Sequence, residues 1–408
     1  MLAQFYAPVI GGEERLTESL AVALVGRGHE VAVATLRQPG QGSYEERDGV
    51  RIHRLPGLAQ RMPWLFSEDG RRHAAPAPDP ATVLALRRVL RRERPDVVHG
   101  HNWLAHAYLP LRRHSRAAYV LSLHDYSLIC ANKRLMRMRE PCSGPGPLKC
   151  LRCAADQYGA LVGPPVALLN LVSGGAQRRA VDLFLPVSRE VAVRCALEAG
   201  RAPYEIVPNF LIDESSTPGL DDQRSDRLPS GDFILYVGDL AADKGVGILV
   251  EAHQGMAHKA PLVLIGRSVE SGLVPERSDI ISLGLLSHGA VLAAWRRCAV
   301  GVVPSITPES FGLVALEAMA AGVPVVASRV GGLRDVVADG EAGILVAPGD
   351  AGELGAALDR LLGDGALRER LGAGGLLRAG QFTAATVVPR FEAAYERARA
   401  TRRVSLGD

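Results

Sequence analysis

Two glutamates, Glu309 and Glu317, are spaced so that they could act on one ligand. Eight residues on a helix advance by roughly 800°, about 80° net, so two carboxylates on one helix would not face a ligand squarely. The pattern instead predicts Glu309 in a loop and Glu317 one to two turns into a helix that starts near Phe311, so that both can reach one cleft. For an isolated pair the plainer interpretation is that Glu309 favours a helix N-terminus and that Glu317 is solvated.

The predicted helix start adds groups that suit an anion. Backbone amides at Phe311, Gly312 and Leu313, directly after Ser310, would point away from the first turn, where the helix dipole favours a phosphate. Gly312 has no side chain, so a ligand could approach its backbone closely. The segment therefore predicts a site for a phosphorylated ligand.

The run from Val303 to Val325 resembles the E-x7-E signature of glycosyltransferase family 4, including the Pro-Ser before it and the Ala-Gly-Val-Pro-Val after it. In that family the first Glu contacts the donor sugar and the second binds the ribose hydroxyls, which implies these roles for Glu309 and Glu317. The resemblance implies an α/β protein of the GT-B fold, with two doubly wound Rossmann-like domains facing each other across a cleft. It also implies retaining transfer of a sugar from a nucleoside-diphosphate sugar to an acceptor hydroxyl.

Further runs resemble family 4 in the right order, over about residues 1–400. The segment 6–14 is similar to the family's glycine loop, where the backbone at Gly11 and Gly12 approaches the donor diphosphate. The segment 121–126 is similar to a strand end whose histidine, here His124, lies near the transferred sugar. Taken alone, His124 could equally be a turn residue bonded to the backbone. Three other runs match: Arg27–Val31, Pro95–His101 and Val207–Phe210.

Two departures from the family pattern stand out. Where the family has Gly-Arg-Leu before Lys-Gly, this chain has Asp239, although Lys244 is kept. A carboxylate there would repel a diphosphate. One strand later the chain has Arg267 where the family commonly has Asp, so we hypothesise that the two charges have exchanged places and that Arg267 binds phosphate. The alternative is an exposed Arg267 with no role. The second departure is that Met1–Phe5 leave little room for a full first strand.

Strand-like runs alternate with helical patterns in both halves, which favours parallel, doubly wound sheets. Between Pro203 and Asp232 the pattern gives way to Pro, Gly, Ser and Asp, as at a domain boundary. We predict an acceptor-side domain over 1–203, a nucleotide-sugar-binding domain over 204–381, and a C-terminal helix over 382–408 that crosses back to the first domain. Expected strands lie at 30–36, 50–55, 97–99, 119–123, 183–187, 233–237, 262–265, 280–283, 300–303, 323–327 and 343–346. Expected helices lie at 13–27, 81–92, 246–253, 291–297, 311–321 and 384–400.

Composition excludes several classes of protein. The 408 residues, 47% apolar and 22% charged, suffice for two globular cores. A net charge of +3 is too small to indicate a nucleic-acid partner. The arginines from Arg87 to Arg94 are expected on a solvated helix face, with a membrane patch as the alternative. No apolar stretch approaches the roughly 20 residues of a bilayer span, and the N-terminus lacks a signal-peptide pattern. We expect a cytoplasmic protein that could rest on a membrane surface, with its oligomeric state left open.

Four of the six cysteines crowd together after the His124 strand: Cys130, Cys142, Cys150 and Cys153. Without an export signal, this clustering favours metal or redox chemistry over structural disulfides. Four thiolates could bind a structural zinc and pin the 130–153 insertion beside the acceptor side of the cleft. Free or redox-active thiols and an iron–sulfur cluster are the alternatives.

The predicted catalysis is electrostatic. No Asp-x-Asp motif occurs, so no divalent ion is expected to bridge the donor phosphates, and no cofactor besides the donor is expected. Lys244, Arg267 and the amides near Gly12 and Gly312 would meet the leaving-group charge. The predicted catalytic residues are His124, Glu309 and Lys244.

The expected partners are a nucleotide sugar and an acceptor, which could be a glycan, a lipid or a small molecule. A different class of function stays open because of Asp239: a GT-B-like regulatory or scaffolding module that binds a sugar nucleotide without transferring it. An epimerase on the same fold is a further alternative, which the E-x7-E run disfavours.

Overall fold

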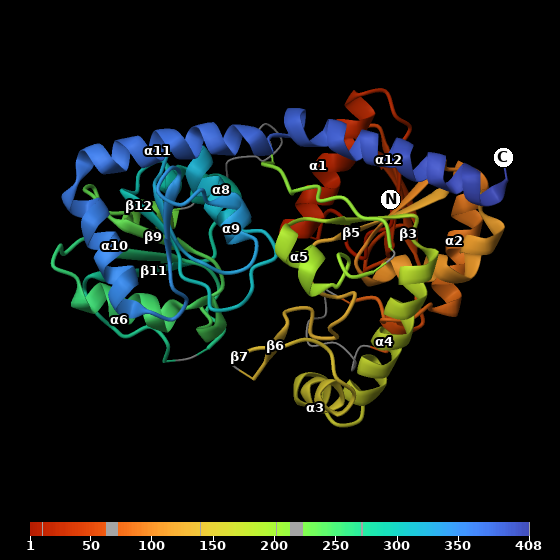
Figure 1. Cartoon of the computed structure of the whole chain (residues 1–408), viewed down its shortest axis with the longest axis horizontal. Helices are drawn as coiled ribbons and strands as arrows, with labels where there is room; N and C mark the ends of the chain where they lie inside the picture. Colours follow the sequence, from red (N-terminus) through yellow and green to blue (C-terminus); the bar gives the residue numbers. More distant parts are fainter. Residues whose placement is uncertain are drawn as a thin grey trace. The chain divides into compact units, whose positions relative to one another are not determined.

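The computed structural model describes residues 1–9, 11–62, 72–138, 140–200, 202–212, 223–270 and 272–407 (Figure 1). The chain divides into two compact units. Unit 1 comprises Met1–Leu135, Ser143–Ile212 and Ala384–Asp408, and unit 2 comprises Met136–Cys142 and Asp213–Thr383. Part of the linker expected between Pro203 and Asp232, residues 213–222, lies outside the described residues, as do Ile10 of the predicted glycine loop and Arg139 of the cysteine insertion.

The sheet of unit 1 is built around two sets of three strands. The orders are β1-β3-β2 and β4-β5-β8, and every pair is parallel except β2 with β3. The strands are β1 (Ala32–Leu36), β2 (Tyr44–Arg47), β3 (Val50–Leu55), β4 (Val97–His101), β5 (Ala118–Leu123) and β8 (Leu183–Pro186). The antiparallel strand β2 was not predicted, because its exposed Tyr-Glu-Glu-Arg sequence carries no apolar face.

The N-terminal residues join the two sets. Leu2 forms parallel bridges to Ala34 in β1 and to Gly100 in β4. The amide of Leu2 donates to the carbonyl of His99 over 2.7 Å, and the carbonyl of Leu2 accepts from His101 over 2.7 Å. The short run at the start of the chain thus occupies the place of a first strand, although few residues are available for it.

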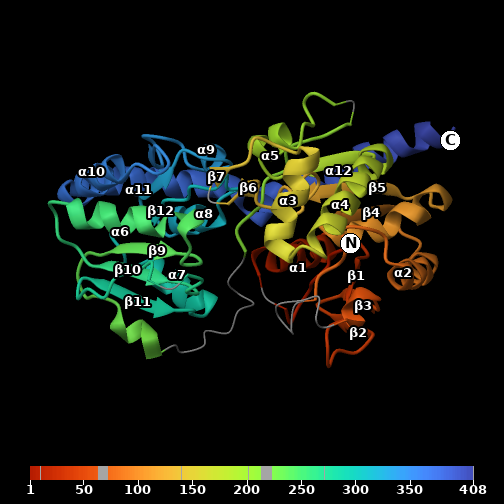
Figure 2. The same cartoon turned by 90° about the horizontal axis from the view of Figure 1, so that it is seen from below.

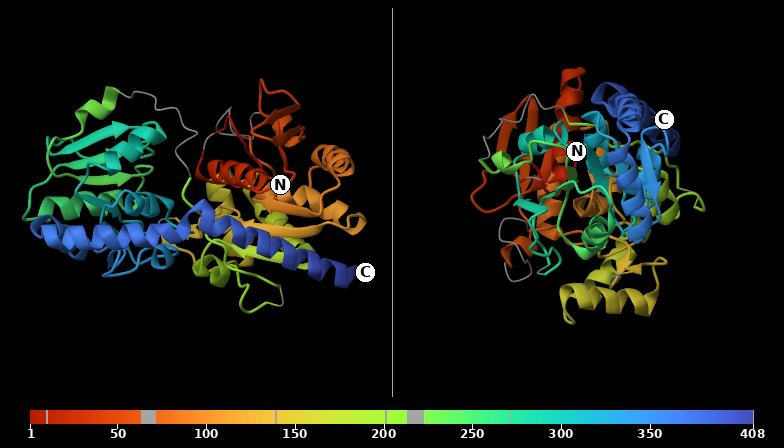
Figure 3. Two further views of the ribbon diagram at one scale, coloured as in Figure 1. Left: turned by 90° about the horizontal axis from the view of Figure 1, so that it is seen from above. Right: turned by 90° about the vertical axis from the view of Figure 1, so that its left-hand side faces the viewer.

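Helices cover the sheet of unit 1. The apolar faces of α1 and α12 pack against the strands in one core that includes Leu20, Val33, Val120 and Phe391 (Figure 3). The predicted solvated arginines from 87 to 94 are exposed on and just after α2. The helices are α1 (Gly12–Gly26), α2 (Pro80–Glu93), α3 (Pro147–Tyr158), α4 (Gly163–Ala180), α5 (Arg189–Arg194) and α12 (Ala384–Leu406). Unit 1 also contains η1 (Ala59–Arg61) and η3 (Trp103–His114), whereas β6 (Met136–Arg137) and β7 (Glu140–Pro141) pair antiparallel in the short segment grouped with unit 2.

Unit 2 contains one parallel six-stranded sheet with the order β11-β10-β9-β12-β13-β14 (Figure 2). The strands are β9 (Ile234–Val237), β10 (Leu262–Ile265), β11 (Ile280–Gly284), β12 (Val300–Val303), β13 (Val325–Ser328) and β14 (Gly343–Val346). The helices are α6 (Val246–Gly255), α7 (His288–Trp295), α8 (Leu313–Ala320), α9 (Leu333–Val336), α10 (Ala351–Gly363) and α11 (Gly365–Ala379), with η5 (Gln223–Arg227), η6 (Ala242–Lys244) and η7 (Gly380–Phe382). Strands β9, β10, β12 and β13 are buried almost throughout, as expected of strands covered on both faces.

The predicted parallel, doubly wound α/β architecture is confirmed. Most expected strands agree with the structure to within two residues, and the predicted helix near Phe311 begins at Leu313. Among the described residues, no helix is both long and apolar enough to cross a membrane.

Candidate active site

The sheet order of unit 2 creates a switch point between two neighbouring strands. The chain fills positions on one side of β9 with β10 and β11, then returns to the other side with β12. Loops after β9 and β12 therefore leave the sheet side by side at its carboxyl edge, where open parallel sheets bind ligands. The first loop carries Lys244 and the second carries Glu309, so two of the predicted site residues lie at this point.

Glu309 accepts two hydrogen bonds at one oxygen. Lys244 Nζ lies 2.6 Å from Glu309 Oε1, and Ser305 Oγ donates to the same oxygen over 2.7 Å. Burial alone would raise the pKa of Glu309, but the ammonium of Lys244 and the two hydrogen bonds hold it below its ordinary value. Glu309 is therefore a carboxylate at neutral pH, fixed in orientation by a cation and a hydroxyl.

Backbone contacts hold the two loops together. The carbonyl of Asp243 accepts from the amides of Ile306 and Thr307, over 3.0 and 3.2 Å. Gly245 has a φ of +75°, and a Cβ on it would lie 1.8 Å from the carbonyl oxygen of Pro304. The glycine after Lys244 is thus required for the close approach that brings Lys244 to Glu309.

Two glycines after β13 support the Glu309 loop from the other side. The amide of Gly332 donates to the carbonyl of Glu309 over 2.7 Å. A Cβ on Gly331, whose φ is +51°, would lie 2.0 Å from that same carbonyl oxygen, and a Cβ on Gly332 would lie 2.5 Å from the oxygen of Ser310. Sequence reasoning missed these residues, although a Gly-Gly pair two residues after an apolar strand was a visible signal of a turn.

The start of α8 is close to the predicted arrangement. Gly312 caps the helix with a φ of +106°, and α8 begins at Leu313, so the first-turn amides follow directly on the Glu309 loop. Phe311 is buried and packs edge-on against Phe382, with ring centroids 5.7 Å apart. Ser310 precedes it, half-buried. Glu317 is half-buried in the second turn of α8.

Asp239 and Arg267 contact each other. Arg267 Nη2 lies 3.2 Å from Asp239 Oδ2, at the ends of the neighbouring strands β9 and β10, and both side chains are exposed. The carboxylate that departs from the family pattern therefore has a cation directly beside it. This contact is the geometry that the charge-exchange hypothesis requires, and the role of Arg267 in binding a ligand stays a prediction.

In unit 1, the predicted His124 follows β5 and is half-buried between two buried polar residues, His101 and Asn209. Its Nδ1 lies 3.3 Å from Asn209 Oδ1, and its Nε2 lies 2.9 Å from Nδ1 of the stacked His101. Because an amide oxygen can only accept, His124 carries its proton on Nδ1 and accepts from His101. Burial lowers the pKa of His124 to about 4, so the ring is neutral at neutral pH.

Glu13 lies within the predicted glycine-loop segment 6–14, but nothing in the sequence indicated its unusual environment. Gly11 and Gly12 lead into α1, and Glu13 is its second residue. Asn102 Nδ2 donates to Glu13 Oε1 over 2.6 Å. Burial, with help from the neighbouring Asp125, raises the pKa of Glu13 to about 8, so much of this carboxyl group is protonated at neutral pH.

The structure does not support the predicted zinc site. The six cysteines form no disulfide, and within the described ranges no group of three or more His, Cys, Asp or Glu residues could hold a metal ion. Cys150 Sγ accepts from the amide of Gly146 over 3.3 Å, and Cys153 Sγ accepts from Asn132 Nδ2 over 3.1 Å. Burial raises the pKa of Cys130, which disfavours the thiolate that zinc requires. Cys150 and Cys153 thus accept separate hydrogen bonds from nearby residues, and the cysteine sulfurs do not converge on one centre.

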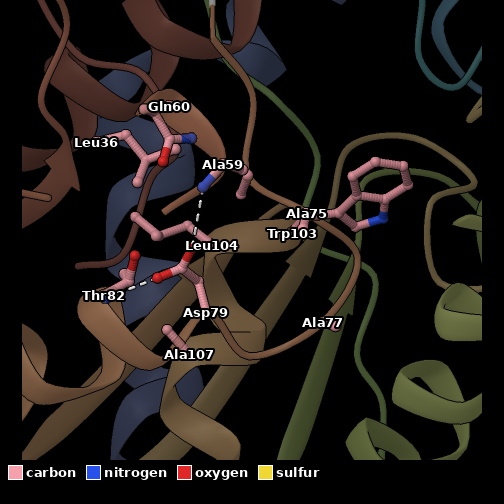
Figure 4. Close-up of a pocket in the computed structure, with 11 residues that line it drawn as sticks. Leu36, Ala59, Gln60, Ala75, Ala77, Asp79, Thr82, Trp103, Leu104 and Ala107 are labelled. Carbon is pink, nitrogen blue, oxygen red and sulfur yellow. Dashed lines mark hydrogen bonds between the residues drawn. The ribbon is translucent and has the colours of Figure 1, made fainter. Parts of the chain in front are cut away.

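Two hollows in unit 1 do not involve any predicted donor residue. One, of about 10 Å³ and so with room for roughly one water, lies beside Trp103 and Asp79, which caps α2 through Thr82 (Figure 4). The other, of about 680 Å³, is lined by Met1, Val97 and Tyr395, among others. It lies at the amino ends of β1 and β4, whereas open parallel sheets bind their ligands at the carboxyl ends of the strands. The loops after β9 and β12 are therefore the stronger candidate for the active site.

Comparison with protein families accounts for most of the chain. Residues 11–209 match the glycosyl transferase 4-like domain, and residues 221–377 match the glycosyl transferases group 1. The chain is a glycosyltransferase, with a glycosyl transferase 4-like domain followed by a glycosyl transferases group 1 domain.

Two relatives of the glycosyltransferase match about nine-tenths of its length, and a third matches a shorter part. An uncharacterized glycosyltransferase of Methanocaldococcus jannaschii is 27% identical over 385 residues, 90% of each chain. The glycogen synthase of Mycobacterium tuberculosis is 28% identical over 91% of this chain and 87% of that protein. The D-inositol 3-phosphate glycosyltransferase of Frankia alni is 38% identical, over 41% of this chain and 47% of that protein.

Solved structures establish the fold of the glycosyltransferase. Sucrose-phosphate synthase from Thermosynechococcus elongatus superposes with a TM-score of 0.70 at 23% identity, covering 96% of this chain and 94% of that one. Anabaena HepE, in complex with UDP and glucose, superposes with a TM-score of 0.67 at 19% identity, covering 97% and 98%. The predicted GT-B fold, with two Rossmann-like domains, is thereby confirmed.

Proposed function

We propose that this glycosyltransferase transfers a sugar, with retention of anomeric configuration, from a nucleoside-diphosphate sugar to an acceptor hydroxyl. The observation that carries the proposal is the convergence of Lys244 and Ser305 on Glu309 at the switch point of the parallel sheet. A cation beside a fixed carboxylate suits a donor whose diphosphate is anionic and whose sugar offers hydroxyl donors. The Anabaena HepE structures with UDP and with UDP-glucose favour the same class of donor.

Each predicted residue has a proposed task. Lys244 neutralises charge that grows on the departing diphosphate, and the first-turn amides of α8 bind its oxygens. Glu309 accepts from hydroxyls of the transferred sugar, and Glu317 accepts from the ribose hydroxyls. His124 is neutral and can only donate or accept hydrogen bonds, so its task is to position a hydroxyl. The backbone at Gly11 and Gly12 approaches the donor diphosphate. Arg267 contributes a further positive charge that binds the diphosphate.

We further propose that unit 2 binds the donor and unit 1 the acceptor, following the predicted boundaries 1–203 and 204–381. The chemistry needs no metal, since Lys244 and the amides supply the positive charge. The acceptor is a hydroxyl of a glycan, a lipid or a small molecule. The alternative of a non-catalytic sugar-nucleotide-binding module rested on Asp239, and the ion pair with Arg267 offsets that carboxylate.

The test is the release of nucleoside diphosphate from a panel of UDP-, GDP- and ADP-sugars, with and without acceptor mixtures. The donor is chosen first by thermal shift, because a ligand at about 100 times its dissociation constant stabilises the fold by about 2.7 kcal/mol. We expect acceptor-dependent release and, by NMR, an α-linked product from an α-linked donor. Stabilisation by a nucleotide sugar without any release would instead favour the regulatory module, and a β-linked product would exclude retention.

A further inference from the structure

The helix α4 carries its apolar side chains outside and its small and polar ones inside. Leu168, Leu171 and Val172 are 58%, 60% and 63% exposed. These positions, i, i+3 and i+4, form one stripe on a helix. The buried residues of the helix are Gly163, Ala167, Asn170, Ser173, Gly174 and Gln177. This is the reverse of the pattern by which a surface helix of a globular protein covers its core.

Close backbone contacts fix α4 in this orientation. A Cβ on Gly174 would lie 2.4 Å from the carbonyl oxygen of Leu128, and a Cβ on Gly163 would lie 2.2 Å from that of Ala154 in α3. Only glycine fits at these two contacts, so a rotation that turned the leucines inward would drive side chains into the backbone. The apolar stripe is therefore a permanent feature of the surface.

The apolar stripe continues beyond α4. Leu161, just before the helix, is 92% exposed, and the exposed Pro165 connects it at i+4 to the stripe. Leu148, at the start of the neighbouring α3, is 72% exposed. The two helices lie side by side as a hairpin (Figures 1 and 2). Exposed apolar surface of this extent marks an interaction site.

The hairpin and the loop before it are strongly basic. Residues 130–181 contain eight Lys and Arg and two acidic residues, a net charge of +6 in a chain whose total is +3. Lys149 and Arg152 lie on α3, and Arg178 and Arg179 lie in the last turn of α4, so cations flank the apolar stripe. The rest of the chain has a net charge of −3, which makes this segment a local feature.

We propose that the α3–α4 hairpin docks on an anionic lipid bilayer. The leucines of the apolar stripe enter the boundary between headgroups and acyl chains, and the flanking lysine and arginine side chains bind lipid phosphates. Charge favours the bilayer over a second copy of the chain, because two copies meeting at this face would bring together two hairpins that each have four Lys and Arg and one acidic residue over 147–180, a net charge of +3. The inference goes beyond the proposed function, since the hairpin contains none of the predicted donor-binding residues.

The experiment measures binding of the full chain to sedimented vesicles of phosphatidylcholine, alone or with about a third phosphatidylglycerol. We expect binding to the mixed vesicles, little binding to phosphatidylcholine alone, and strong weakening at about 0.5 M salt. The double variant Leu168→Gln/Leu171→Gln should partition at least about tenfold more weakly, because two leucines no longer enter the bilayer. Both side chains are exposed, so the variant should fold normally, which circular dichroism checks.

The matched control is Leu376→Gln/Leu377→Gln, which changes two exposed leucines on α11 and should bind vesicles like the wild type. The proposal fails if the wild type does not sediment with anionic vesicles, or if the two double variants bind equally. It also fails if the wild type forms a dimer without lipid and Leu168→Gln/Leu171→Gln abolishes it, since a second copy would then cover the stripe.

Discussion

Lys244 Nζ and Glu309 Oε1 lie 2.6 Å apart although 65 positions separate the two residues in the sequence. The contact exists because the chain crosses the sheet between β9 and β12, so that two loops distant in sequence leave it at one edge. Each charge fixes the other: the ammonium keeps a buried carboxylate ionised, and the carboxylate holds the ammonium at the strand ends. The pair is the centre of the site on which the proposed function depends.

Replacement of Lys244 by Met should reduce kcat/KM for the donor by about 100-fold or more, because the departing diphosphate loses its cation. Glu309 loses its partner at the same time, so burial should raise its pKa and move the acid limb of the pH–rate profile to higher pH. Steady-state rates of nucleotide release from pH 5 to 9 measure both effects.

Lys259→Met is the matched control, because Lys259 is exposed on the surface of unit 2 and away from the loops after β9 and β12. Its rate and pH profile should equal those of the wild type. A Lys244→Met protein with more than about a third of the wild-type rate would contradict the assigned role.

Replacement of Arg267 by Ala should weaken nucleoside-diphosphate binding about three- to tenfold, because it removes a cation and leaves Asp239 to repel the phosphates. Asp239→Asn in the same background should restore part of the affinity. Calorimetric titration with the nucleoside diphosphate gives both numbers. Equal affinity in the wild type and in Arg267→Ala would mean that the arginine is only a surface residue.

A methyl group on Gly331 should disturb the Glu309 loop, since a Cβ there would lie 2.0 Å from the carbonyl oxygen of Glu309. Gly331→Ala is expected to cost about 3 kcal/mol or more in the free energy of unfolding, and to reduce activity strongly in the protein that still folds. Urea denaturation and nucleotide release measure these effects.

Gly349→Ala provides the comparison, because Gly349 also has a positive φ, +80°, but nothing lies within 4 Å of its Cβ position. It should cost only about 1 kcal/mol, the backbone contribution alone, and leave activity unchanged. If the two alanine variants behaved alike, support of the Glu309 loop by Gly331 would be disproved.

The sequence predicted secondary structure best where a single physical requirement, such as burial on both faces of a sheet, determines the residue types. Strands such as Val300–Val303 are apolar throughout because helices cover both faces of the sheet, and this pattern needs no tertiary information. The loop position of Glu309 and the helical position of Glu317 follow from the same alternation of strand, loop and helix. What the alternation cannot show is which loops meet, since the contact of Lys244 with Glu309 depends on the order of strands in the sheet.

Residues whose environment comes from distant segments were missed. Glu13 looks like an ordinary acidic residue in the first turn of a helix, and only burial beside Asn102 and Asp125 changes its pKa. The helix α4 was not predicted, and its burial could not have been read from the sequence, because the apolar stripe that would be expected to cover the core faces solvent. The cysteine spacing suggested zinc because C-x-x-C is a common ligand pair, yet tetrahedral convergence of four sulfurs depends on loop geometry that spacing does not fix.

Glu13 should make stability depend on pH in the direction opposite to that of a salt-bridged acid. Its pKa in the folded state, about 8, lies above the ordinary value of 4.5, so the folded protein binds the proton more tightly than the unfolded chain. Its contribution to stability is complete below about pH 4.5 and declines as the pH rises to about 8. In Glu13→Gln, which has no proton to lose, that decline should vanish, leaving the variant about 4 kcal/mol more stable relative to wild type at pH 9 than at pH 5. Urea denaturation at pH 5, 7 and 9 measures the difference, with Glu46→Gln on the exposed strand β2 expected to follow the wild type. If the free energy of unfolding depended on pH equally in the wild type and in Glu13→Gln, the Glu13 carboxyl would ionise as readily in the folded protein as in the unfolded chain.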